Sequence, residues 1–136
     1  MGARRKGREA ALQMLYQMDA SGQPGAEVVR LFWLHLGHGQ EGEDFANELL
    51  LGAERESERV DAAIRAVSEH WRMERMARVD RNILRLGCYE LLFVAEVPRR
   101  VTINEAIELA KRFGSEGSAS FLNGVLDRIA TYAKKD

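Results

Sequence analysis

The sequence predicts an all-α protein, a compact helical bundle of about six to eight helices in two subdomains. Apolar residues recur at intervals of three and four in one segment after another, which is the period of an amphipathic helix. Glycine-marked turns separate these segments, and no useful stretch alternates polar and apolar residues as a strand would. With 136 residues, 46% of them hydrophobic, the chain is expected to form one domain, residues 1–136, with a substantial core.

Three helices are expected in the first part of the chain. The first covers residues 1–19, where a basic start leads into an apolar face that includes Met14 and Met18. The second covers residues 27–36 and ends at the glycines that follow it. The third covers residues 44–55 and completes this part of the fold.

The next two helices are placed by candidate capping residues. Ser57 is expected to cap a helix that ends around Trp71, and Asp80 is expected to cap the one after it. The helix after Asp80 is apolar on most sides, which is typical of a helix at the centre of a core. The C-terminal subdomain is therefore expected to cover about residues 78–136.

Two further helices are predicted near the end of the chain. Thr102 and Glu105 have the spacing of a capping box, and Gly114 stands where the helix that follows would stop. A last helix is expected to begin near Ser118. Gly124 lies inside it, where glycine costs about 1 kcal/mol relative to alanine, so a close helix–helix contact is predicted at that position.

The turn between these two helices is rich in glycine and serine. It is expected to present small polar side chains and backbone amides near two cations, Lys111 and Arg112. Phe121 follows the turn immediately. An aromatic ring beside cations is a combination that single-stranded RNA can use, although packing in the core is the alternative for Phe121.

Composition limits the classes of protein to consider. Cys88 is the only cysteine, so an internal disulfide is excluded and a reducing, cytoplasmic setting is expected. No apolar run approaches the roughly 18 residues of a membrane span, so no membrane association is expected. The net charge of -1 means that any site for nucleic acid must come from local clustering of cations.

The search for catalytic or metal-binding residues finds no candidates. The histidines His35, His38 and His70 lack partners at metal-ligand spacing, and neither HExxH nor CxxC occurs. The serines of the turn have no histidine nearby in the sequence that could activate them. We therefore expect no enzymatic activity, no cofactor and no bound metal.

The cations are concentrated at the start of the chain. Four of them precede the first acid, Glu9: Arg4, Arg5, Lys6 and Arg8. Cations are unfavourable at a helix N-terminus because of the helix dipole. A solvated tail is the alternative, but the run leads directly into a helix, which favours a fixed site for an anionic partner.

Three sequence blocks resemble one known family. They are ARRKGREAALQMLYQMD at residues 3–19, RVDRNILRLGCYELL at residues 78–92, and NEAIELAKRFG followed by FLNGVLD near the C-terminus. In this order and spacing they resemble the bacterial transcription antitermination factor NusB. The three blocks cover roughly half of the chain, and the resemblance implies the same two-subdomain helical fold.

The resemblance also implies a function. NusB proteins bind single-stranded boxA RNA of nascent ribosomal RNA together with NusE, a small-subunit ribosomal protein, within an RNA polymerase antitermination complex. The RNA-binding residues that carry over from the family are Arg4, Arg5, Lys6, Arg8, Gly117, Ser118 and Phe121. We add Lys111 and Arg112 from the turn and Arg85, a cation in an otherwise apolar helix, for which a surface role is the alternative.

The expected NusE contacts lie at the start of the RVDRNILR helix, on Asp80, Arg81 and Leu84. Two positions depart from the family, Gly87 where alanine is more usual and Gly117 where an acid is common. Two other functions stay open: an accessory module for ribosomal-RNA maturation or modification, and a protein-interaction bundle that binds no RNA. Some family members are homodimers, so a homodimer also stays open.

Overall fold

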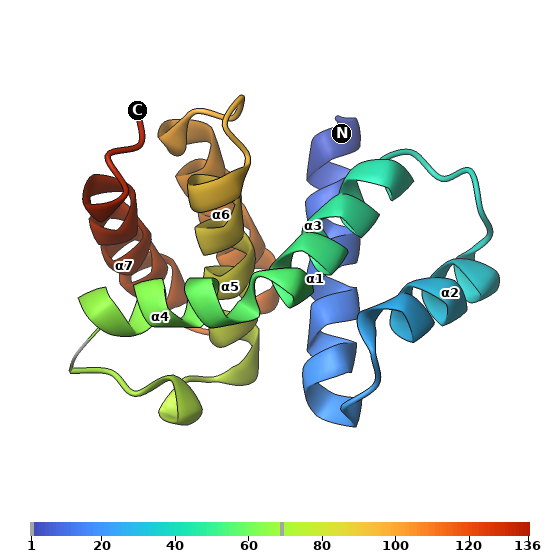
Figure 1. Ribbon diagram of the computed structural model, residues 1–136, viewed down its shortest axis with the longest axis horizontal. Helices are drawn as coiled ribbons and strands as arrows, with labels where there is room; N and C mark the ends of the chain where they lie inside the picture. The colour runs from blue at the N-terminus through green and yellow to red at the C-terminus, as the bar shows by residue number, and fades with distance from the viewer. Residues whose placement is uncertain (1, 69) are drawn as a thin grey trace. The chain divides into compact units, whose positions relative to one another are not determined.

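The computed structural model describes residues 2–68 and 70–136, which form seven α-helices, one 3-10 helix and no strand (Figure 1). The all-α prediction and the expected number of helices are confirmed. The chain divides into two compact units, Met1–Arg55 and Glu56–Asp136. The second unit begins well before the expected residue 78, because the helix before that point packs with the C-terminal helices. Within the described residues no helix is both long enough and apolar enough to cross a membrane.

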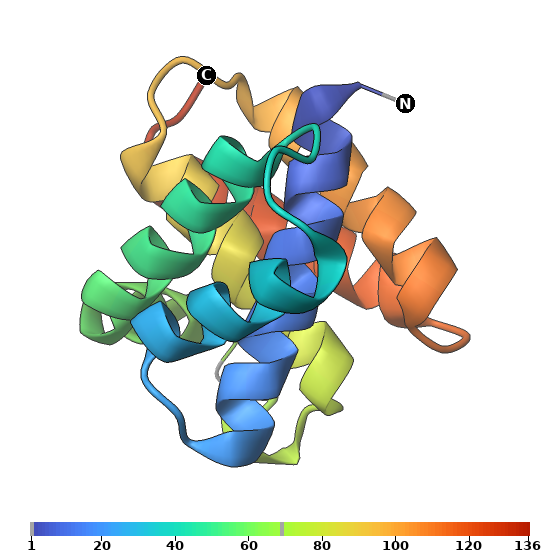
Figure 2. The same cartoon turned by 90° about the vertical axis from the view of Figure 1, so that its right-hand side faces the viewer.

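The first unit contains α1 (Ala3–Ser21), α2 (Gly25–Leu36) and α3 (Glu43–Arg55). Helices α1 and α3 lie side by side, and the loop between α2 and α3 passes across the beginning of α1 (Figure 2). Met14 and Leu49 are fully buried. The Trp33 indole N–H donates to the Asn47 side chain at 2.7 Å and so joins α2 to α3.

The second unit contains α4 (Ser57–Val67), the 3-10 helix η1 (Met73–Arg75), α5 (Arg78–Phe93), α6 (Arg99–Phe113) and α7 (Ser118–Tyr132). Helix α5 contacts α4, α6 and α7, which confirms the predicted central position.

Three predicted caps are wrong although the helices exist. Helix α6 begins at Arg99 after Pro98, so Thr102 lies inside it, where its hydroxyl donates to the buried Glu90 carboxylate at 3.2 Å. Pro98 precedes the helix in an extended conformation, and its carbonyl accepts the Val101 N–H at 3.0 Å and the Thr102 N–H at 3.3 Å. Neither Ser57 nor Asp80 caps a helix, because Ser57 begins α4 and Asp80 lies in the first turn of α5.

The helix that begins at Ser57 also ends earlier than expected, at Val67 instead of near Trp71. The hydroxyl of Ser68 donates to the carbonyl of Ile64 at 2.6 Å, and the chain leaves the helix at that point. Serine side chains compete with backbone hydrogen bonds in this way and favour helix ends. Trp71 therefore lies in a loop.

The predicted close contact at Gly124 is wrong. A Cβ atom added there would meet nothing within 4 Å, so the glycine faces open space. The close approach of two helices is at Gly87 instead, where a Cβ atom would lie 2.9 Å from Cδ2 of Leu126 on α7. Gly87 therefore admits α7 closer to α5 than a larger residue would allow.

Candidate nucleic-acid interface

The cationic start of the chain is part of an ordered helix. Helix α1 begins at Ala3, so the cations occupy its first two turns, and Arg4, Arg5 and Lys6 are exposed. The Lys6 ammonium lies 3.8 Å from the carboxylate of Glu41, an exposed pair that contributes little to stability. These three side chains form a cationic surface with a defined position on the first unit.

An aromatic ring from α3 supports this surface. The guanidinium carbons of Arg4 and Arg8 lie 5.0 Å and 5.3 Å from the ring centroid of Phe45, which is within the range of a cation–π interaction. Arg8 is only 4% exposed, so the prediction that it contacts RNA directly is corrected. Its guanidinium lies against the protein and helps to hold α1 on α3.

Two glycines bring the backbones together at the same place. A Cβ atom on Gly7 would lie 2.9 Å from the Gly42 carbonyl oxygen, and one on Gly42 would collide with the backbone of α1 at Ala3 and Gly7. Gly42 also has a φ of +86°, which favours glycine. The 37–42 loop therefore packs directly against the turn of α1 that carries the cations.

The same loop is tied to the beginning of α3. The Glu43 carboxylate lies 3.0 Å from the His38 ring nitrogen and accepts the Gly39 N–H at 2.7 Å. These interactions lower the pKa of the Glu43 carboxyl, with the hydrogen bond to His38 as the largest cause. An ionised Glu43 near the N-terminus of α3 is also favoured by the helix dipole.

In the second unit, the turn between α6 and α7 is closed by a serine. Ser118 is 3% exposed, and its hydroxyl accepts the Ser115 N–H at 3.0 Å and donates to the Asp80 carboxylate at 2.8 Å. The predicted direct RNA contact of Ser118 is therefore corrected to a role in shaping the turn. Gly117 remains exposed, with a φ of +89° that favours glycine.

The aromatic residue after the turn is partly exposed. Phe121 is half-buried, and its ring meets the ring of Trp71 edge-to-face with centroids 5.7 Å apart. Trp71 is 60% exposed. Sequence reasoning missed it, because the segment that carries Trp71 was assigned to a helix when it is a loop.

The two cations at the end of α6 are exposed. Lys111 forms a loose pair with Glu108 at 3.8 Å, and the Arg112 guanidinium lies 5.1 Å from the centre of the Phe113 ring. Exposed pairs of this kind leave a lysine available to an anion, because they are weak and rearrange easily.

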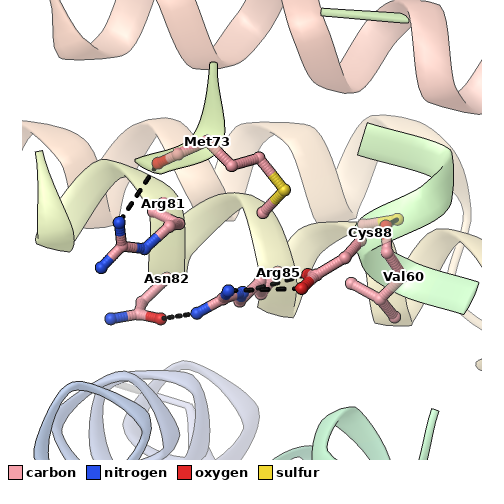
Figure 3. Close-up of polar contacts among 7 residues, drawn as sticks. Val60, Met73, Arg81, Asn82, Arg85 and Cys88 are labelled. Atoms are coloured by element: carbon pink, nitrogen blue, oxygen red, sulfur yellow. Dashed lines mark hydrogen bonds and ion pairs between the residues drawn. The ribbon is translucent and has the colours of Figure 1, made fainter. Parts of the chain in front are cut away.

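Arg85 has a structural role that the sequence did not indicate. Its guanidinium reaches both carboxylate oxygens of Asp61 at 3.1 Å and 3.3 Å, and it also donates to Asn82 at 3.2 Å (Figure 3). A bidentate pair of this kind joins α5 to α4 with fixed geometry. The side chain of Arg85 is 24% exposed, and its RNA contact stays a prediction.

Next to this pair, Cys88 is fully buried and its thiol points toward the Val60 carbonyl at 3.7 Å (Figure 3). Burial raises the pKa of the thiol to about 12, and the negative charge of Asp61 adds to the rise. Cys88 is therefore a buried core thiol that stays protonated near neutral pH. Among the described residues no group of three or more His, Cys, Asp or Glu side chains could hold a metal ion.

The residues expected to bind NusE fall into two classes. Leu84 is fully buried, so it has no surface to offer a partner and that assignment is corrected. Asp80 and Arg81 are half-buried at the start of α5. Asp80 accepts the Ser118 hydroxyl, and Arg81 donates to the Met73 carbonyl at 3.1 Å (Figure 3).

The three blocks that carried the family resemblance lie on the cationic helix α1, on the central α5, and on α6 and α7 to either side of the glycine-serine turn. The model of the NusB family matches residues 5–131. The chain belongs to the NusB family. Among its NusB relatives is the transcription antitermination protein NusB of Sorangium cellulosum, which is 55% identical over 130 residues and covers 96% of this chain and 93% of the relative.

Solved NusB structures share the fold. NusB of T. maritima superimposes with a TM-score of 0.85 at 37% identity, covering 94% of this chain and 90% of that one. NusB in a complex with NusE and double-stranded RNA superimposes with a TM-score of 0.85 at 27% identity, covering 96% and 97% of the two chains. That relative therefore forms a complex with NusE, the predicted protein partner, and with RNA that is double-stranded, whereas the sequence predicts single-stranded RNA here.

Proposed function

We propose that this chain is a transcription antitermination factor that binds boxA-type RNA of nascent ribosomal RNA together with the ribosomal protein NusE. The observation that carries the proposal is the ordered cationic surface of Arg4, Arg5 and Lys6 on the first turns of α1. Clustered cations in fixed positions bind a phosphate backbone even when the net charge of the protein is close to zero.

The second unit adds groups that recognise unpaired bases. Phe121 offers part of its ring at the start of α7, next to the exposed Gly117, while Lys111 and Arg112 supply positive charge from the end of α6. An aromatic surface near cations is the usual arrangement for single-stranded RNA. The protein acts by assembly in this proposal, and no covalent bond is made or broken.

NusE is proposed to bind the surface at the start of α5, on Asp80 and Arg81. The complex of a relative with NusE and RNA supports this choice of partner. The hydrogen bond between Asp80 and Ser118 links the start of α5 to the turn that opens α7. Binding at one of these places can therefore influence the shape of the other, within the RNA polymerase antitermination complex in the cytoplasm.

A titration of the purified chain with a short boxA-type RNA, with and without NusE, tests the proposal. We expect tighter binding to the boxA-type RNA than to a scrambled RNA of equal composition, with a further gain when NusE is present. Equal affinity for the two RNAs would favour a general accessory module of RNA maturation. Binding of NusE with no measurable binding of RNA would favour a protein-interaction bundle, and either result would contradict the proposal.

A further inference from the structure

The second unit displays a large aromatic side chain between α4 and η1. Trp71 is 60% exposed, yet its N–H donates to the carbonyl of the buried Ser68 at 2.8 Å. Two residues further on, Met73 is 3% exposed, and its carbonyl accepts a hydrogen bond from Arg81 at 3.1 Å. Trp71 thus projects from between two anchored residues, so its exposure belongs to the folded structure.

One face of α7 meets this loop at two points. Phe121, Gly124 and Arg128 are spaced three and four residues apart, so they lie on the same side of the helix. The Phe121 ring packs edge-to-face on Trp71, and the Arg128 guanidinium donates to the Val67 carbonyl at 3.2 Å. Helices α4 and α7 are neighbours, as Figure 1 illustrates.

Between these two points the surface is open. A Cβ atom on Gly124 would meet nothing within 4 Å. Glycine in a helix interior is less favourable than alanine, and no atom of the residues that the structure describes accounts for it here. Glycine is also used where a ligand approaches the backbone closely, which is the explanation that fits this position.

The loop that carries Trp71 and the 3-10 helix after it contain two exposed cations, Arg72 and Arg75, beside the exposed acid Glu74. Arg128 is exposed as well and uses one of its five N–H donors on the Val67 carbonyl. Aromatic faces combined with cations suit a strand of unpaired nucleotides, because bases stack on the rings while phosphates are neutralised.

We propose that Trp71, Phe121, Gly124 and Arg128 form a binding site for one unpaired nucleotide. In this site the base lies against the aromatic pair and over Gly124, and the phosphate lies at Arg128. This inference rests on the proposed RNA-binding function and deepens it. It assigns the stacking surface to two rings from different parts of the second unit, and it gives the glycine of α7 a role in binding.

Intrinsic fluorescence of the full chain tests the role of Trp71. The chain has two tryptophans, and Trp33 is 3% exposed, so the change on adding RNA should come from Trp71. We expect boxA-type RNA to quench the emission of the wild type and to leave the Trp71→Phe variant almost unchanged. Trp71→Ala should bind RNA roughly 5- to 150-fold more weakly, while Trp71→Phe retains most of the affinity. Equal quenching in wild type and Trp71→Phe would overturn the proposal.

A second variant tests the open space at Gly124. Gly124→Leu introduces a good helix former where nothing lies within 4 Å, so the melting temperature should stay the same or rise. RNA affinity should nevertheless fall several-fold, because the side chain fills the place of the base. Unchanged RNA affinity in a folded Gly124→Leu protein would show that no nucleotide lies there.

The outcomes separate this inference from the proposed function. If the wild type binds boxA-type RNA and all three variants bind it equally well, the nucleotide site is wrong and the RNA-binding function stands. If the wild type binds no RNA, the proposed function fails first. Variants that keep RNA affinity but lose NusE would identify this face as a protein-docking surface and overturn the nucleotide site.

Discussion

The two units present their candidate RNA-binding groups in different ways. In the first unit the groups are cations on a regular helix, held in place by the Phe45 ring and by the glycine contact between Gly7 and Gly42. In the second unit the cations are joined by two aromatic rings, Trp71 between α4 and η1 and Phe121 in the first turn of α7. The first surface is suited to phosphates, and only the second offers rings on which bases can stack.

This difference has a measurable consequence. Contacts with phosphates release counterions, so they make affinity depend on salt concentration, whereas stacking on an aromatic ring does not. A variant of the first unit should therefore change the salt dependence of RNA binding. A variant of the aromatic residues in the second unit should lower affinity by about the same factor at every salt concentration.

The largest effect is expected from the triple variant Arg4→Ala, Arg5→Ala, Lys6→Ala. The slope of log affinity against log salt concentration changes by about 0.7 for each phosphate contact, so losing three contacts should flatten it by about 2. Near 0.05 M salt the same loss should weaken binding roughly 100- to 1,000-fold. Filter binding or fluorescence anisotropy over a series of salt concentrations measures both quantities. Arg30→Ala, which removes an exposed cation from α2, is the matched control and should leave the slope unchanged. A triple variant with the wild-type slope would contradict the assignment.

Removing the ring of Phe121 should have the next largest effect. Phe121→Ala should weaken RNA binding by about 1–3 kcal/mol with the same salt slope as the wild type. Because the ring is half-buried, the melting temperature should fall less than for a core phenylalanine, where the loss is about 3–5 kcal/mol. Phe121→Tyr keeps the ring and serves as the control. Loss of folding, or normal RNA binding with reduced stability, would make Phe121 a packing residue only.

The sequence predicted most of the fold, because helix periodicity and glycine-marked turns are local signals. It failed where a side chain's role depends on a distant partner. Thr102 has the local spacing of a cap, yet it bonds Glu90 on another helix. Gly124 and Gly87 are both helix glycines in the sequence, and only the packing of α7 on α5 decides which one is a contact.

The candidate site follows the same rule. Arg4, Arg5 and Lys6 could be identified from their clustering, and they lie exposed as expected. Arg8 belongs to the same cluster in the sequence, but the position of Phe45 on α3 buries it. Trp71 could not be identified, since no local pattern shows that the helix before it ends at Val67.

A smaller effect, on stability, is expected from Ser118→Ala. The change removes the acceptor of the Ser115 N–H and the donor to Asp80, so the free energy of unfolding should fall by about 1–2 kcal/mol. Thermal or denaturant unfolding measures this. The exposed neighbour Ser120→Ala is the matched control and should be close to neutral. Equal stability of the two variants would show that the hydrogen bonds of Ser118 do not hold the turn.

The smallest effect is expected from Phe45, which supports the cations without contacting RNA. In Phe45→Leu the exposed guanidinium group of Arg4 loses the aromatic face, an interaction of about 0.5–1 kcal/mol at an exposed site. RNA affinity should fall about two- to five-fold as Arg4 becomes less well ordered. The salt slope should stay close to that of the wild type, because no phosphate contact is deleted.

Phe45→Tyr retains an aromatic face and should therefore bind RNA with the affinity of the wild type. If Phe45 acted only through hydrophobic packing, Phe45→Tyr would have no reason to bind RNA better than Phe45→Leu. If Phe45→Leu and Phe45→Tyr bind RNA equally well, the ring does not position the cations. The contact between Gly7 and Gly42 would then be what holds the cationic turn of α1 in place.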